Sequence, residues 1–219
     1  MANLKTGERV RHLLEAIFTA LLFGTQTILN AGIFISIMSI PLLPYLFYFL
    51  SGQHPLTALE FNIYVMLFAK EFWVGRAIAL IGVAVLSLAA TQLLWNRHTG
   101  VVLIKTGMYS VVRHPQFSGI IIITVGLTVM VLTNSTDSLF QIVGLWLIQI
   151  LGYIAIARYE EWCLSKKIGE EYRQYKRKVP FLFMVKCPSR IPETLFTIFM
   201  AVLLSVVLTF FPYGLIRIL

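Results

Sequence analysis

The chain has 219 residues, of which 58% are hydrophobic and 13% are charged, and its mean hydropathy is +0.81. Soluble domains usually carry about 25% charged residues, so the composition excludes that class and predicts an all-α, polytopic integral membrane bundle. The net charge of +8 comes from basic residues beside apolar segments, which indicates membrane orientation and contact with membrane lipids, not nucleic-acid binding.

The N-terminal third is the least regular part of the sequence. Residues 13–40 form an apolar run that Pro41 and Pro44 break or kink. A span needs about 20 residues, so residues 13–51 form either one long helix with an irregular tail or a tight pair of spans. The run is too long for a cleavable signal peptide and lacks a small-residue cleavage site. Residues 56–72 mix apolar and charged side chains, which predicts an interfacial or partly buried helix.

The remaining apolar segments bring the total to about five spans. The predicted spans cover residues 77–94, 116–133, 138–157 and 193–211. The third is expected to continue as a helix to residue 167, and an amphipathic helix follows at residues 169–178. We therefore expect a single membrane domain with N-terminal helices at 1–73, a catalytic core at 74–182 and an extra C-terminal span at 183–219.

The basic residues are distributed asymmetrically along these spans. If the first apolar run crosses the membrane an odd number of times, 15 of the 18 lysines and arginines lie on one side, and the turn at residues 134–137 on the other side has none. Positively charged loops face the cytoplasm. The sequence thus predicts that the N-terminus, the loop at 96–115 and the segment at 158–191 are cytosolic.

The first polar segment, residues 105–119, reads KTGMYSVVRHPQFSG. Proline is favoured at the first position of a helix, so Pro115 is expected to open a span with His114 at or beside its N-cap. Free N–H groups and the helix dipole then favour a carboxylate or phosphate at this point, and Tyr109 and Phe117 offer aromatic surface for an adenine ring. Alternatively, Arg113 reaches lipid phosphates and Tyr109 is an interfacial anchor.

The second polar segment, residues 157–180, contains two adjacent acidic residues. On a continuous helix Glu161 shares a face with Arg158, which predicts an ordinary surface pair. Glu160 shares a largely apolar face with Tyr153 and Leu164, so it is expected to point into the bundle, where a carboxylate is a functional candidate. The alternative for Glu160 is a buried ion pair with Arg113 or Arg97. Residues 169–178 are expected to be either a lipid-surface anchor or a lid over a cofactor.

Together the two segments resemble the isoprenylcysteine carboxyl methyltransferase family and its phospholipid methyltransferase-like relatives. The shared pattern is G-x-Y-x-x-x-R-H-P-x-[YF]-x-G, two spans, and then E-E-x-x-x-x-x-x-[FI]-G-x-x-Y-x-x-Y-x-x-x-V-P, over residues 74–182. The resemblance implies an enzyme that binds S-adenosylmethionine at the cytosolic face and takes a lipophilic or lipidated acceptor from the bilayer. Relatives often carry an arginine where this chain has Ile156, so we expect weak or no activity on a simple prenylcysteine carboxylate.

Carried over position by position, the resemblance implies a set of site residues. The catalytic candidates are Glu160 and Arg113. The implied cofactor contacts are Val101, Val102, Leu103, Ile104, Tyr109, His114, Pro115, Gln116, Phe117 and Glu160. The two cysteines have no metal-ligand spacing, so no metal site is expected.

Two other functions fit parts of the same pattern. One is a sterol-reductase-like membrane enzyme that uses NADPH, whose additional phosphate would need more cations in the pocket. The other is a non-catalytic lipid-binding membrane protein. It would explain the spans, but not a carboxylate on the bundle face opposite an Arg-His-Pro helix start.

Overall fold

The computed structural model describes residues 36–50, 68–134, 139–188 and 190–215. The chain divides into two units, Met1–Ile40 and Pro41–Leu219, and most of the first lies outside the described residues. The described part is helical and contains no strand. Three predictions fall mostly on residues that are not described: the one or two spans in residues 13–51, of which 36–50 are described, the helix at 56–72 and the turn at 134–137.

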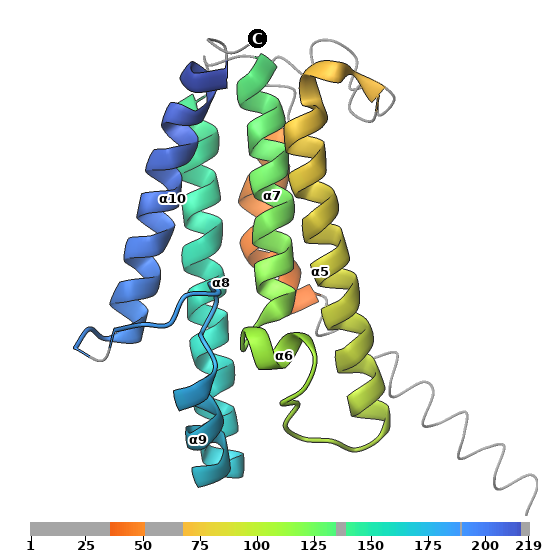
Figure 1. Ribbon diagram of the computed structural model, residues 1–219, viewed down its shortest axis with the longest axis vertical. Helices are drawn as coiled ribbons and strands as arrows, with labels where there is room; N and C mark the ends of the chain where they lie inside the picture. The colour runs from red at the N-terminus through yellow and green to blue at the C-terminus, as the bar shows by residue number, and fades with distance from the viewer. Residues whose placement is uncertain (1–35, 51–67, 135–138, 189, 216–219) are drawn as a thin grey trace, which may run out of the picture. The chain divides into compact units, whose positions relative to one another are not determined.

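Four long helices form the second unit (Figure 1). They are α5 (Trp73–His98), α7 (Pro115–Asn134), α8 (Leu139–Ile168) and α10 (Glu193–Leu215). Each is long and apolar enough to cross a membrane, which confirms the predicted polytopic helical bundle. The short helix α2 (Leu43–Leu50), preceded by a 3₁₀ turn at Ile40–Leu42, packs against α8, and Gly152 leaves the room that Pro41 fills.

Helices α5 and α7 pack closely because glycines line both sides of their contact. Gly75 and Gly82 lie seven residues apart on α5, and Gly119 and Gly126 lie seven apart on α7. A Cβ atom at Gly126 would lie 2.5 Å from both the Ala79 nitrogen and the Gly75 oxygen. Small residues at such intervals allow two membrane helices to bring their backbones together.

Polar side chains also link the helices inside the bundle. The Thr124 hydroxyl of α7 accepts hydrogen bonds from Trp146 Nε1 and Gln149 Nε2 of α8, each at 3.2 Å. The Tyr45 hydroxyl of α2 donates to the Thr124 carbonyl at 3.2 Å. Because lipid tails offer no hydrogen-bond partner, such contacts help to hold apolar helices together.

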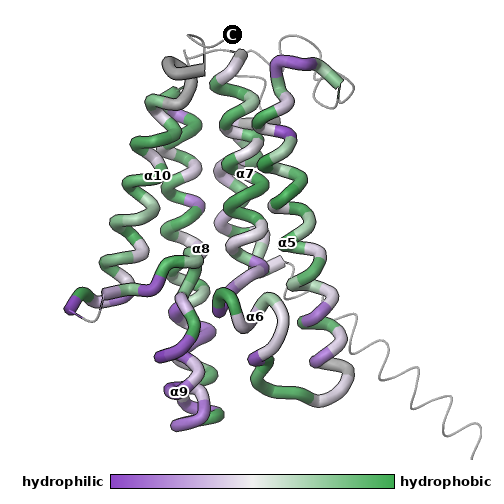
Figure 2. Tube along the Cα trace, viewed as in Figure 1, coloured by the Kyte–Doolittle hydropathy of each residue, from purple (hydrophilic) through white to green (hydrophobic). Residues whose placement is uncertain are grey.

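The polar end of the bundle is the end where α5 and α8 finish and α7 and α10 begin. It also contains the short helix α6 (Met108–Val111) and the helix α9 (Glu170–Lys178), and the hydrophilic colouring of α9 stands out there in Figure 2. At about 1.5 Å per residue, α8 is roughly 45 Å long and exceeds a hydrocarbon core of about 30 Å. Its last turns therefore project toward this end, as the sequence predicted.

Candidate functional site

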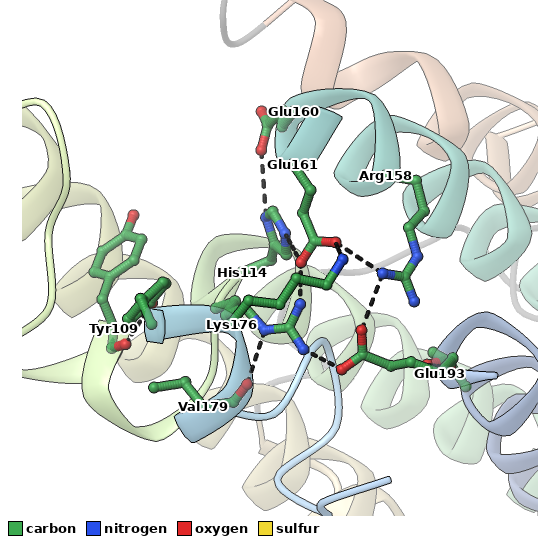
Figure 3. Close-up of polar contacts among 11 residues, drawn as sticks. Tyr109, His114, Arg158, Glu160, Glu161, Lys176, Val179 and Glu193 are labelled. Carbon is green, nitrogen blue, oxygen red and sulfur yellow. Dashed lines mark hydrogen bonds and ion pairs between the residues drawn. The ribbon is translucent and has the colours of Figure 1, made fainter. Parts of the chain in front are cut away.

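The two polar segments of the sequence meet at the polar end through an ion cluster centred on Glu161. We define the Glu161 cluster as Arg113, Arg158, Glu161, Lys176 and Glu193, which come from the residues before α7, from α8, from α9 and from α10 (Figure 3). Glu161 Oε2 accepts from Arg158 Nη1 at 2.7 Å and from Lys176 Nζ at 2.8 Å, and Glu161 Oε1 pairs with Arg113. Three cations thus share two carboxylates, of which Glu161 is almost fully buried.

Arg113 connects the start of α7 to the segment that follows α9 and to the first turn of α10. Its Nη2 pairs with Glu193, and its Nε donates to the Val179 carbonyl at 2.8 Å. Its backbone N–H donates to the Pro180 carbonyl at 2.9 Å. Only 1% of its side chain is exposed, so these protein groups enclose the guanidinium. The catalytic role predicted for Arg113 stays a prediction, and this geometry favours a positioning role.

His114 lies between the two acidic residues of α8. Its Nδ1 is 3.3 Å from Glu160 Oε2, and its Nε2 is 3.9 Å from Glu161 Oε1. The ring stacks on Phe117 at 5.6 Å and meets the edge of Phe181 at 5.4 Å. Burial lowers the pKa of His114, but hydrogen bonds and negative charge from Glu160 and Glu161 outweigh burial and hold the pKa above its ordinary value of 6.5.

We expect the raised pKa of His114 to appear as a pH-dependent stability. A histidine with a raised folded-state pKa contributes stability that is complete below its unfolded pKa of about 6.5 and is lost as pH rises through the folded value. The stability advantage of the wild type over His114→Gln should therefore be largest below about pH 6.5 and shrink as the pH rises above it. Thermal unfolding of both proteins in detergent measures it, and a difference that does not change with pH would contradict the prediction.

The structure reverses the environments that the sequence predicted for Glu160 and Glu161. The predicted pair between Arg158 and Glu161 is present, but Glu161 is buried and not near water, with 3% of its side chain exposed. Glu160, expected to point into the bundle, has 29% of its side chain exposed and contacts His114. The predicted surface role of Glu161 is therefore wrong, and the buried partner of Arg113 is Glu161 instead of Glu160.

The aromatic and amide candidates near the start of α7 are mostly buried. Pro115 opens α7 as predicted. Phe117 is fully buried, and its ring stacks on Tyr153 at 5.1 Å as well as on His114. Gln116 is buried and accepts a hydrogen bond from the Tyr109 hydroxyl at 3.3 Å. Phe117 thus packs against protein rings on two sides, whereas Glu160 keeps part of its side chain open.

The loop before α6 contains the other predicted cofactor contacts and packs against α9. Val101 and Val102 are exposed, whereas Ile104 is buried. Leu103 lies against the cluster formed by Tyr172, Tyr175 and Val179. The structure therefore brings this loop, through α9, to the same end of the bundle as His114 and Glu160.

Helix α9 is fastened to the rest of the polar end by three contacts. Lys105 Nζ pairs with Glu171 at 2.6 Å, the Tyr175 hydroxyl donates to the Tyr109 carbonyl at 2.6 Å, and Lys176 pairs with Glu161. Gly169, with φ of +69°, supplies the left-handed turn between α8 and α9. Helix α9 therefore packs against the loop at 101–104. Whether α9 acts as a lipid anchor or as a lid stays a prediction.

Sequence reasoning misses three residues of this site. The pattern presents Lys176 as part of a basic surface, and Glu193 only as the start of a span. Phe181 lies beneath two cations, with the Arg158 guanidinium carbon 3.9 Å from its ring centre and that of Arg113 at 5.5 Å. A signal is present for Glu193, because a lone carboxylate in the first turn of an apolar span indicates a buried partner.

Comparisons with known proteins agree with the motifs. A family model described as "Protein of unknown function (DUF1295)" matches residues 17–179. Two rice proteins, from Oryza sativa subsp. indica and subsp. japonica, are each named "Probable protein-S-isoprenylcysteine O-methyltransferase". Each is 32% identical over 123 residues, which cover 50% of this chain and 61% of the relative.

A third relative, from Arabidopsis thaliana, is named "Protein-S-isoprenylcysteine O-methyltransferase B". It is 33% identical over 78 residues, which cover 36% of this chain and 37% of the relative. The chain thus spans less than two thirds of the length of these relatives. The resemblance predicted from the motifs is confirmed at this level. No solved structure matches the chain.

Proposed function

The chain belongs to the DUF1295 family, and from this premise we propose that it is an S-adenosylmethionine-dependent membrane methyltransferase. It transfers a methyl group to a lipophilic or lipidated acceptor at the cytosolic membrane face. The names of the rice and Arabidopsis relatives support the reaction class. The basic residues gathered at the polar end support the cytosolic placement, because positively charged loops stay in the cytoplasm.

The observation that carries this proposal is the direct contact between His114 and Glu160. His114 belongs to the Arg-His-Pro segment that opens α7, and Glu160 belongs to the acidic pair of α8. Their side chains approach to 3.3 Å, although the residues are far apart in sequence. The resemblance assigns both segments to cofactor binding. Two segments can form one cofactor site only if they lie next to each other, as this contact requires.

The groups present at this contact fit the chemistry of the cofactor. Glu160 offers a partly exposed carboxylate that suits a cationic group or ribose hydroxyls. His114 Nε2 is buried 3.9 Å from Glu161 Oε1 and forms no hydrogen bond among the described residues. Protonation of the ring, which the two carboxylates favour, would add positive charge beside the start of α7. The first turn of α7 leaves backbone N–H groups without helical acceptors, which suits a carboxylate.

When bound, S-adenosylmethionine supplies an electrophilic methyl group on a sulfonium. We assign Glu160 to hold the cationic end or the ribose, and His114 with the start of α7 to hold the carboxylate. Arg113 and Glu161 act as positioning residues, because they fix the start of α7 against α8 and α10. The buried rings of Phe117 and Phe181 exclude water from behind His114.

The reductase alternative receives less support from the charges at this site. An additional phosphate on a cofactor bound at His114 and Glu160 would need free cations there, but Arg113, Arg158 and Lys176 are already paired with Glu161 or Glu193. Arg177, Lys178 and Lys186, which form no ion pair among the described residues, border a space that neither His114 nor Glu160 lines. A methyl donor makes no such demand. Ile156 supports an acceptor other than a simple prenylcysteine carboxylate, since no cation stands at that position.

Replacing Glu160 with glutamine should weaken binding of S-adenosylhomocysteine about 10- to 150-fold, since a charge-assisted hydrogen bond contributes about 1.5–3 kcal/mol. Calorimetric titration in detergent measures the affinity. Glu170→Gln is the matched control, because it makes the same substitution at an exposed position, and Glu170 pairs only with Arg173 among the described residues. Equal affinities of the two variants would remove Glu160 from the site.

The same preparation separates the three candidate functions. A rise in melting temperature with S-adenosylhomocysteine, but not with NADPH, is expected for a methyltransferase, and the reverse order would favour the reductase. No response to either cofactor would favour the lipid-binding protein. A methyl-transfer assay with a labelled donor, over prenylcysteine, aminophospholipid, sterol or quinone, and thiol acceptors, then identifies the acceptor class.

A further inference from the structure

A cavity at the polar end lies outside the contact between His114 and Glu160. Its volume is about 250 Å³, and it is bordered by the last turn of α9, by the segment that follows α9 and by the first turn of α10. Ligand pockets for drug-sized molecules usually begin near 300 Å³, so this cavity has the size of a small polar group. Val179 and Pro180, which end the family pattern, line it, but none of the residues assigned to cofactor binding does.

The walls of this cavity carry an excess of positive charge. Lys176 and Glu193 line it, but both are already engaged in the Glu161 cluster. The other charged lining residues are Arg177, Lys178 and Lys186. None of these three forms an ion pair with a carboxylate in the described ranges.

An ordinary role explains only part of this charge. Basic residues in the last turn of α9 complement its dipole, as Glu170 and Glu171 do in its first turn. Lys186, however, lies outside any helix and still borders the same space. Three cations around one opening therefore favour an anion there beyond what the helix terminus alone requires.

The apolar residues around the cavity indicate which kind of anion fits it. Apolar side chains also line the cavity, among them Val179 and Ile191. Met184, Val185 and Leu195 are each more than 45% exposed next to it, at the point where the chain enters the apolar helix α10. Exposed apolar side chains beside a basic opening are typical of an interface that contacts anionic lipid.

We propose that the cavity between α9 and α10 binds a phosphate group, carried either by the head of an anionic phospholipid or by a soluble phosphate. The phosphate oxygens accept hydrogen bonds from Arg177, Lys178 and Lys186. A lipid in this position keeps its acyl chains against the exposed apolar residues at the start of α10. The site lies beside the Glu161 cluster through Lys176 and Glu193, and it does not depend on the proposed function.

The test uses the full chain purified in detergent and three probes at fixed ionic strength. The probes are short-chain phosphatidylglycerol, short-chain phosphatidylcholine and inorganic phosphate, each titrated calorimetrically. The site variant Arg177→Gln/Lys178→Gln/Lys186→Gln should weaken phosphatidylglycerol binding by about tenfold or more. The matched control, Lys166→Gln/Lys167→Gln/Arg173→Gln, removes the same charge from exposed positions at the same end and should leave binding nearly unchanged.

The outcomes distinguish the two sources and the competing explanation. Saturable binding of phosphatidylglycerol alone supports a lipid head, whereas equal binding of inorganic phosphate supports a soluble anion. Equal losses of affinity in the site variant and in the control would show that general surface charge causes the binding, and would overturn the proposal. The absence of saturable binding by any of the three probes would overturn it too. If the triple variant does not fold, Lys186→Gln alone, at an exposed loop position, gives the same comparison against Lys167→Gln.

Discussion

Replacing Glu161 with glutamine should lower the free energy of unfolding by about 3–5 kcal/mol, the cost of removing one partner from a buried ion pair. Glutamine keeps the size of the side chain but removes the negative charge shared by Arg113, Arg158 and Lys176. Arg113 and Arg158 then retain only Glu193 within the cluster, and Lys176 loses its carboxylate partner. Unfolding in mixed detergent micelles, followed by circular dichroism, measures the change.

The control for this prediction is an exposed acidic residue at the same end of the bundle. Glu171 pairs with Lys105 at 2.6 Å, but both side chains are about half exposed, at 59% and 45%. Surface pairs contribute about 0–1 kcal/mol, so Glu171→Gln should have little effect. If Glu161→Gln were as mild as Glu171→Gln, the Glu161 cluster would not hold the polar end together.

Replacing Gly126 with leucine should lower the free energy of unfolding by about 3 kcal/mol or more, at the upper end of the usual cost of overpacking. The new Cβ atom alone would lie 2.5 Å from the Ala79 nitrogen and the Gly75 oxygen. Both are backbone atoms of α5, so the helices must separate along their glycine contacts. The same micelle unfolding measurement gives the change in stability.

Gly144 on α8 provides the matched position for this substitution. A Cβ atom at Gly144 meets no described atom within 4 Å, so Gly144→Leu should leave stability nearly unchanged. A comparable loss in both variants would attribute the effect to leucine itself instead of to the contact between α5 and α7.

The ends of the helices could be predicted because single residues determine them. Pro115 begins α7, Gly169 separates α8 from α9, and Pro180 follows the end of α9, as the fixed φ of proline and the freedom of glycine dictate. Length and hydropathy were sufficient for the four spans that follow residue 70. The shifts are at the ends of α5, which covers Trp73–His98 instead of residues 77–94, and of α10, which ends at Leu215 instead of residue 211. At the start of α5, an apolar helix tolerates Arg76 near its end.

The environments of Glu160 and Glu161 could not be predicted from their own helix. Spacing on α8 identifies Arg158 as a neighbour of Glu161, and that contact is present. Arg113 and Lys176 arrive from other elements and surround Glu161. Whether a carboxylate is buried depends on the sum of these partners, and a helical periodicity describes only one of them.

The composition of the Glu161 cluster has a consequence for shortened versions of this protein. The family match ends at residue 179, and the sequence-based core at residue 182, yet Glu193 supplies one of the two carboxylates of the cluster. A fragment that stops before α10 would leave Arg113, Arg158 and Lys176 to share Glu161 alone. Any truncated form made for expression or crystallisation should therefore retain the first turn of α10, even if the rest of that helix serves only as an anchor.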